Sequence, residues 1–118
     1  MTLSRRFLSF PVAQGSVAYL LVGGGAAGFG GYAAAGGGGG GVRSSYDTEA
    51  SGGPDGVVEE MLSFSSGTTY TITVGAGGAR LGNTVNPTWA GTGGVSSISG
   101  SDITTITTTG STDHSGGS

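Results

Sequence analysis

The chain has 118 residues, 28 of them glycine, and a formal net charge of −3 at pH 7. This length allows at most one domain, and a chain without cysteine has neither a disulfide framework nor a thiolate site. Four arginines are its only basic residues, so it lacks the basic surface that nucleic-acid binding requires, and no run of about twenty apolar residues is present to span a bilayer.

Residues 1–15 contain a pair of arginines, Arg5 and Arg6, in a context that looks like a twin-arginine export signal. Such a signal needs a continuous apolar core of about 7–15 residues. Pro11 and Gln14 interrupt the apolar run here. We therefore expect residues 1–15 to be an N-terminal arm or anchor rather than a processed signal.

Residues 16–22 form a compact apolar run that predicts a β-strand. Directly after it, Gly23, Gly25 and Gly28 match G-x-G-x-x-G, the fingerprint of dinucleotide-binding folds. That fingerprint must open a helix, and each glycine inside a helix costs ~0.8–1 kcal/mol relative to alanine. The residues that follow are too rich in glycine for a helix, so we expect glycine-lined loops and no nucleotide cofactor.

Six consecutive glycines interrupt the chain next. Because glycine has no side chain, such a run can form an extended helix of the polyproline-II type, and several of them can pack at backbone distance. We expect the hydrogen bonds of this packing to run between chains, and the alternative is a flexible linker. The residues expected to pack are Gly36, Gly37, Gly38, Gly39, Gly40 and Gly41.

Residues 57–64 and 69–74 predict two further strands, joined by a turn that contains Gly67 into a β-hairpin. Strict alternation in 69–74 indicates a half-buried strand with an apolar face and a threonine face. Glu59 and Glu60 are adjacent and face opposite sides of a strand. We therefore interpret them as a solvated edge or a capping contact rather than as a pair of catalytic carboxylates.

Residues 95–99 and 103–109 predict the last two strands. Ile103 and Ile106 break the alternation of the second one, which indicates a bulge or a switch of face. His114 is the only histidine and lies in a serine- and glycine-rich tail, so no metal site is expected. Glycine, serine and threonine make up about half of the chain, and full disorder is the alternative that the strand-like segments argue against.

The segment LSFSSGTTYTITVGAGG at residues 62–78 is the most specific in the chain. It closely resembles the glycine-rich domain of bacteriophage tail fibres and related virion proteins, as do the opening YLLVGGG at 19–25 and GVSSISG at 94–100. The resemblance covers roughly residues 16–110. It implies a virion structural role, with variable loops between glycine tracts contacting the host, and residues 42–55 look like an inserted variable loop.

The expected fold class is therefore all-β: a small β-sandwich-like module with long glycine-rich, polyglycine-II-like loops. Residues 16–110 are the glycine-rich β domain, and residues 111–118 are a flexible tail or the start of a missing segment. Ordering 28 glycines costs roughly 14–28 kcal/mol more than ordering alanines, at ~0.5–1 kcal/mol each. We therefore expect neighbours to complete the fold, either copies of the chain in a trimer or the virion surface.

Four aromatic residues lie in glycine-rich or turn-rich surroundings rather than on alternating strands, and such side chains often anchor interfaces. The alternative is that they fill the small core. The candidate surface or partner contacts are Phe29, Tyr32, Tyr46 and Trp89.

The functional expectation is a non-enzymatic bacteriophage tail-fibre or adhesin component that contacts the host surface. No metal or other cofactor and no membrane insertion is expected, and a serine or threonine without a nearby histidine has no activating base. The alternative is a capsid-decorating cement protein on the outer shell. The expected partners are other virion proteins, copies of the chain itself and a host cell-surface molecule. A fragment of a flavin or nicotinamide enzyme is the disfavoured third hypothesis.

Overall fold

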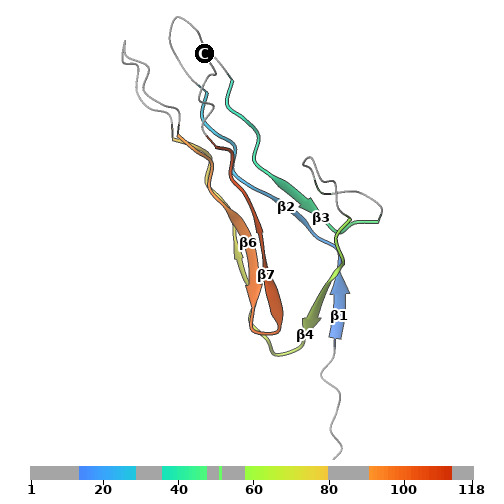
Figure 1. The fold of residues 1–118 in the computed structure, drawn as a ribbon. Coiled ribbons are helices and arrows are strands. Elements are labelled where there is room, and N and C mark those ends of the chain that lie inside the picture. The colour runs from blue at the N-terminus through green and yellow to red at the C-terminus, as the bar shows by residue number, and fades with distance from the viewer. Residues whose placement is uncertain (1–13, 29–35, 48–50, 52–57, 80–90, 113–118) are drawn as a thin grey trace, which may run out of the picture.

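The structure is a computed structural model that describes residues 14–28, 36–47, 51, 58–79 and 91–112. Within this part of the chain the regular elements are strands and no helix occurs, so the expected all-β fold class is confirmed (Figure 1). The strands are β1 (Gln14–Val17), β2 (Leu20–Val22), β3 (Val42–Ser44), β4 (Leu62–Ser65), β5 (Thr71–Thr73), β6 (Ser96–Gly100) and β7 (Ile103–Thr108).

The strands form three small antiparallel sheets rather than one large one. β1 pairs with β4, β2 pairs with β3, and β5, β6 and β7 form a three-stranded sheet in that order. β2 lies against β6 and β7, so the β2–β3 ribbon and the three-stranded sheet face each other as two thin layers (Figure 1). The β1–β4 ribbon follows the β2–β3 ribbon at the end remote from the glycine-rich tracts (Figure 1).

The prediction that residues 57–64 and 69–74 pair as a β-hairpin is wrong. β4 pairs with β1, and β5 pairs with β6 through Ile72 opposite Ile98. The turn between them exists, and Gly67 takes the left-handed φ of 83° that favours glycine. The turn leads the chain from the β1–β4 sheet into the three-stranded sheet, because β4 and β5 each pair with a strand that is distant in the sequence.

β3 was not predicted, since residues 42–55 were interpreted as an inserted loop. Its three residues pair with β2, with Val22 opposite Val42. The bulge expected around Ile103 and Ile106 is confirmed. Between the pairs Ile98–Ile106 and Gly100–Ile103, one residue of β6 (Ser99) lies opposite two residues of β7 (Thr104 and Thr105).

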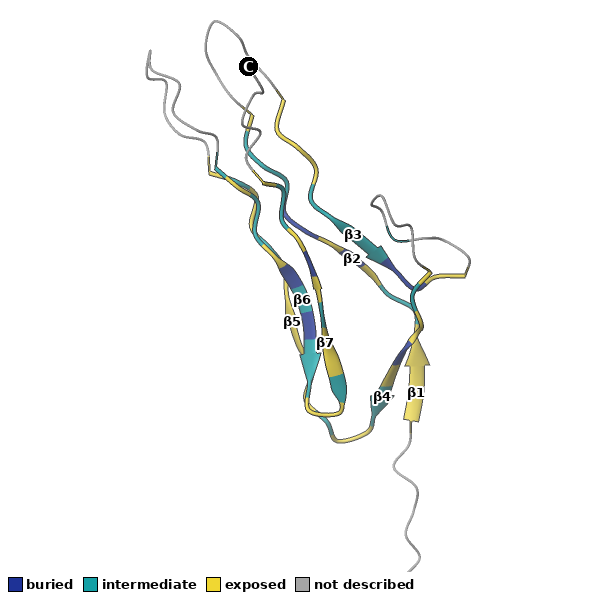
Figure 2. Cartoon of the chain, in the orientation of Figure 1, coloured by how far each residue is buried: buried dark blue, intermediate teal, exposed yellow. Residues whose placement is uncertain are grey.

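The apolar core formed by the described residues is small. Among the described residues only Leu21, Leu62 and Ile98 are buried hydrophobic side chains, with Tyr19, Phe64, Ile103 and Ile106 packed partly against them (Figure 2). Burying one such aliphatic side chain contributes ~1.5–3 kcal/mol. Packing of apolar side chains therefore supplies only a small part of what holds these strands together.

β5 departs from the half-buried pattern predicted for residues 69–74. All three residues of the strand are exposed. Ile72 shares a row with Ile98 and Ile106 across the sheet, yet its side chain is 68% exposed while that of Ile98 is 7% exposed. The reason is position: β2 covers β6 and β7, whereas β5 is the edge strand beyond it.

A bundle of backbone tracts extends the layers at the other end. Residues 23–28 lie at its centre and hydrogen-bond through the backbone to four further tracts, 36–41, 75–79, 91–95 and 109–112. We call these five tracts the glycine bundle. Its hydrogen bonds were expected between separate chains, but those described here join tracts of one chain.

The bonds of the central tract repeat every third residue. Gly23 and Ala26 donate to the carbonyls of Gly41 and Gly38, at 2.8 and 2.9 Å. The alternate pair, Gly24 and Ala27, donates to the tract 91–95 at 2.9 Å. Three residues per turn is the period of the polyproline-II helix. The expected polyglycine-II-like arrangement of the glycine-rich segments is therefore present.

The bundle leaves no room for side chains between its tracts. A Cβ atom added at most of its inner glycines would overlap a backbone carbonyl oxygen of the neighbouring tract. The residues for which this holds are Gly23, Gly24, Gly37, Gly40, Gly75, Gly78, Gly93 and Gly110. Glycine is thus required at these positions by the closeness of the backbones, and a backbone that close can hydrogen-bond directly.

Replacing Gly24 with alanine is expected to break the bundle at its centre, because the new Cβ would overlap the carbonyl of Ala76. Overpacking of this kind costs ~1–3 kcal/mol or more, and we expect a loss of about 3 kcal/mol in the free energy of unfolding. Gly77→Ala is the matched control, since the nearest atom to its added Cβ is Gly25 O at 3.9 Å. Urea unfolding followed by circular dichroism measures both. Equal losses for the two variants would contradict the close packing.

Candidate functional site

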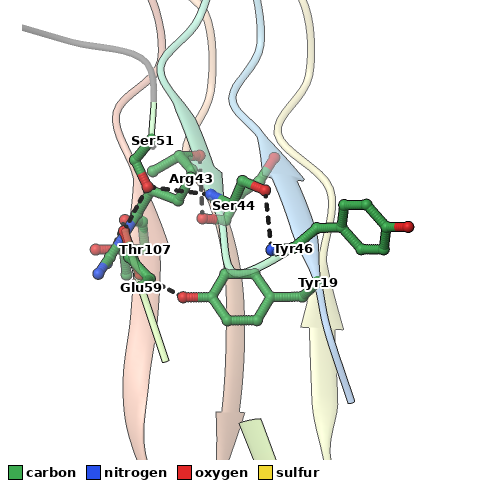
Figure 3. A network of polar contacts seen from close by, with 9 residues as sticks. Tyr19, Arg43, Ser44, Tyr46, Ser51, Glu59 and Thr107 are labelled. Atoms are coloured by element: carbon green, nitrogen blue, oxygen red, sulfur yellow. Dashed lines mark hydrogen bonds and ion pairs between the residues drawn. The ribbon is translucent and has the colours of Figure 1, made fainter. Parts of the chain in front are cut away.

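The most connected group of polar side chains lies where β2, β3 and β7 meet residues 51 and 58–60 (Figure 3). The Glu59 carboxylate accepts hydrogen bonds from Arg43 Nε at 2.5 Å, from Ser51 Oγ at 2.9 Å and from the Tyr19 hydroxyl. Arg43 also donates from Nη1 to the carbonyl of Thr107 on β7, at 3.1 Å. We call Tyr19, Arg43, Ser51 and Glu59 the Glu59 cluster.

Three donors converge on one carboxylate, and this fixes its charge. Burial of Glu59 raises its pKa, but the hydrogen bonds from Arg43, Tyr19 and Ser51 outweigh burial and lower the pKa below the ordinary value. Burial and the hydrogen bond to Glu59 raise the pKa of Tyr19 to about 12. The hydrogen bond to Glu59 likewise raises the pKa of Arg43. At neutral pH the cluster is thus a stable ion pair with a neutral tyrosine donor.

Glu59 was interpreted as a solvated edge or capping residue, and that interpretation is wrong. Its side chain is 14% exposed and its partner Arg43 is 37% exposed. The error follows from distance in the sequence, since Tyr19 lies 40 residues from Glu59. The neighbouring Glu60 is exposed, as expected for the opposite side of the chain.

The Glu59 cluster joins separate segments of the chain through one ion pair and several hydrogen bonds. Every donor that reaches the carboxylate comes from the same chain, and the described part of the structure leaves no buried side-chain nitrogen or oxygen without a hydrogen-bond partner. The same described residues contain no group of three metal-ligating side chains. The cluster ties β2 and β3 to the chain that leads into β4, and through Thr107 to the three-stranded sheet.

The predicted aromatic contacts do not all lie in described parts of the chain. Phe29, Tyr32 and Trp89 lie outside the described residues. Tyr46 is described: its side chain is 63% exposed, its backbone N–H donates to Ser44 Oγ at 3.2 Å, and its ring points away from the Glu59 cluster (Figure 3). Tyr46 follows β3 at the end of that strand opposite the glycine bundle.

The glycine bundle brings together the chain ends that flank the other three aromatics. Ala27 donates to Gly91 and Gly91 donates to Ala79, while Ala26 donates to Gly38. Tracts 23–28 and 75–79 therefore end where tracts 36–41 and 91–95 begin. The segment with Phe29 and Tyr32 and the segment with Trp89 are consequently both joined to the same end of the bundle. We call this the bundle end.

The six glycines of residues 36–41 form one outer tract of the bundle. Gly41 donates to Thr109 and accepts from Gly23, both at 2.8 Å, and Gly38 accepts from Ala26. The tract therefore bonds to both the central tract and the C-terminal one. The composition of residues 36–41 predicts an extended tract, but no local sequence signal indicates which tracts are its neighbours.

The residues of the nucleotide fingerprint take part in the same bundle. Gly23 and Gly25 lie in the extended central tract, where Gly25 accepts from Gly78 at 2.8 Å. Residues 23–28 run directly from β2 into the bundle and contain no helical turn. No described helix has the length and apolar character of a membrane span.

An all-β fold built on a bundle of glycine tracts defines a glycine-rich structural domain. The comparison with protein families agrees: the chain belongs to the glycine-rich domain family, whose family model matches residues 2–118. No curated protein and no solved structure matches the chain. The family assignment covers the sheets, the Glu59 cluster and the glycine bundle together.

Substituting Glu59 with glutamine is expected to lower the free energy of unfolding at pH 7 by about 1–2 kcal/mol, as one charged acceptor of hydrogen bonds is lost at a partly exposed site. Because folding lowers the pKa of Glu59, its contribution is present above the unfolded pKa of ~4.3 and is lost as the pH falls through the folded value. Urea unfolding at pH 7 and pH 3 should show the difference between wild type and variant shrinking at low pH. An equal difference at both would contradict an ionised Glu59 in the folded chain. Tyr19→Phe, which removes a single donor, is the milder control.

Proposed function

We propose that this chain is a non-enzymatic structural protein of a bacteriophage virion, a tail-fibre or adhesin component that contacts the host surface. The observation that carries the proposal is the bundle end. Two aromatic-bearing segments, 29–35 and 80–90, are joined to the same end of a backbone-bonded bundle. The resemblance of residues 62–78 to phage tail-fibre domains supplies the virion context.

A hydrogen-bonded bundle that carries two aromatic-bearing segments at one end suits recognition of a cell surface. Binding residues are often placed on loops that a rigid scaffold positions, and Tyr and Trp are enriched among the residues that dominate binding energy. Phe29, Tyr32 and Trp89 are the proposed host contacts at the bundle end. Tyr46 lies elsewhere and, at 63% exposure, is a proposed contact with another virion protein.

The remaining exposed apolar side chains support partners inside a particle. Nine large hydrophobic side chains among the described residues are exposed. Several lie on the strands away from the bundle end, including Val17, Leu20 and Ile72. Contiguous exposed apolar patches mark interaction sites, and we propose that these side chains contribute to such patches. Other virion proteins, or copies of this chain such as the trimer suggested by the sequence, are the proposed partners.

The same exposed strands favour a second candidate function, that of a decoration protein which clamps neighbouring subunits of the outer capsid. In that arrangement the apolar strands face the shell. In both candidates the chain is located in the virion, and neither needs a cofactor.

Immunogold labelling of purified phage particles that carry this chain separates the two candidates. We expect label at the tail or its fibres. Label spread evenly over the head would replace the adhesin by the capsid-decorating function. Particles without label would contradict both, and an absorbance spectrum of the purified chain would then show whether a flavin or nicotinamide is bound.

The host-contact residues are tested by competition. The purified chain should inhibit attachment of the phage to its host cells, and Trp89→Ala should raise the concentration needed by about 30-fold, as expected for a ~2 kcal/mol interface anchor. Thr104→Ala is the matched control, because Thr104 is exposed on β7. Equal inhibition by both variants, with unchanged circular dichroism, would exclude Trp89 as a host contact.

A further inference from the structure

The β2–β3 ribbon has an inner and an outer face. On the inner face Leu21 is buried, and its cross-strand partner Arg43 reaches β7. Side chains alternate along a strand, so Leu20 and Val22 point to the opposite side. Leu20 is 67% exposed and Val22 is 49% exposed, and Val22 lies opposite Val42. We call Leu20, Val22 and Val42 the outer ribbon face, and this face is apolar.

The ribbon is negatively charged near the end where β2 begins. Asp47 is exposed and comes three residues after the end of β3. Glu60 is also exposed, and it adjoins Glu59, which binds the hydroxyl of Tyr19 directly before β2. Arg43, the one basic residue of the described part of the chain, is already paired with Glu59. A partner that combines apolar side chains with positive charge therefore fits this surface.

Residues 1–13 have this composition. The family model matches the chain from residue 2 onward, so the family pattern includes most of this segment. The segment contains the arginine pair that resembles an export signal, together with Leu3, Phe7, Leu8 and Phe10. The other segments outside the described residues fit less well. They either contain no leucine, phenylalanine, tyrosine or tryptophan (48–50, 52–57 and 113–118) or are joined to the bundle end (29–35 and 80–90).

The segment is long enough to reach the outer ribbon face. Leu20 is six residues from Gln14, the first residue of β1, so at ~3.3–3.6 Å per residue the two lie at most about 22 Å apart. Phe7 is seven residues from Gln14 in the other direction and can reach about 25 Å. Pro11, between Phe7 and Gln14, favours a turn. β1 is exposed along its whole length, so a segment that turns back can run beside it.

We propose that residues 3–10 turn back and dock on the outer ribbon face of their own chain. Phe7 lies over Leu20, and apolar side chains of both surfaces are removed from water. The arginine pair faces the negatively charged end of the ribbon, and this attraction sets where the segment docks. This docking is independent of the proposed virion function. It leaves Ile72, on the other layer, as apolar surface for virion partners.

Thiol labelling of the full chain measures how well residues 3–10 cover this face. The chain has no cysteine, so Leu20→Cys carries a single thiol. Its labelling by a soluble maleimide should become about tenfold faster when Phe7→Ser is added, as expected for a segment docked about nine-tenths of the time. Ile72→Cys is the matched control, because Ile72 is 68% exposed and Leu20 is 67% exposed, and Phe7→Ser should leave its rate unchanged. A rate at Leu20→Cys that Phe7→Ser does not alter would overturn the docking.

Disulfide formation identifies which chain supplies the segment. In a glutathione redox buffer, Phe7→Cys with Leu20→Cys should form a disulfide within one chain, in higher yield than Phe7→Cys with Ser63→Cys. Ser63 is a strict control, because it is exposed on β4 opposite Ser16 and so lies nearer than Leu20 to the start of the segment at Gln14. An equal or higher yield at Ser63→Cys would show an undocked segment, and a disulfide-linked dimer would show that the segment binds a neighbouring copy. Either result would overturn the proposal.

Discussion

The close approach of glycine backbones is the constraint on which the rest of this structure depends. The central tract of residues 23–28 can bond to four neighbours at 2.8–2.9 Å only because no side chain stands between them. Each sheet strand next to the bundle continues directly into one of its tracts, as β2 does at Gly23 and β6 does from Val95. The bundle therefore fixes which strands emerge side by side, and the two thin layers follow from its order.

Hydrogen bonds between polar groups make many of the links between strands that apolar packing makes in most domains. Ser96 is 1% exposed, and its hydroxyl donates to the carbonyl of Val22 at 2.6 Å and accepts from the N–H of Gly75 at 2.9 Å. It satisfies backbone groups where the sheets pass into the bundle, and a buried group of this kind is costly to leave unpaired. The Glu59 cluster likewise satisfies a backbone group between the layers, since Arg43 donates to the carbonyl of Thr107. Three hydrophobic side chains are buried among the described residues, and hydrogen bonds join each described glycine tract to its neighbours.

A fold of this kind leaves apolar side chains exposed for partners to cover. The tracts of the glycine bundle are hydrogen-bonded to one another, yet each ordered glycine loses more conformational entropy than any other residue. Exposed side chains such as Ile72 and Val74, at 68% and 82% exposure, offer further apolar burial that the single chain does not use. Partners that cover these side chains would add the missing burial. This is the physical reason why the proposed assembly with virion proteins suits the molecule.

The sequence by itself determined the all-β class, the places of most strands, the turn at Gly67 and the extended character of residues 36–41, because alternation, composition and backbone freedom are local properties. Only the tertiary structure decided that β4 pairs with β1 rather than with β5, that residues 42–44 are a strand, and that Glu59 is clasped by Tyr19 and Arg43. The reason is physical. Short strands rich in serine and threonine resemble one another, and glycine tracts have no side chains with which to specify neighbours, so their partners are set by which backbones the whole fold brings within hydrogen-bonding distance.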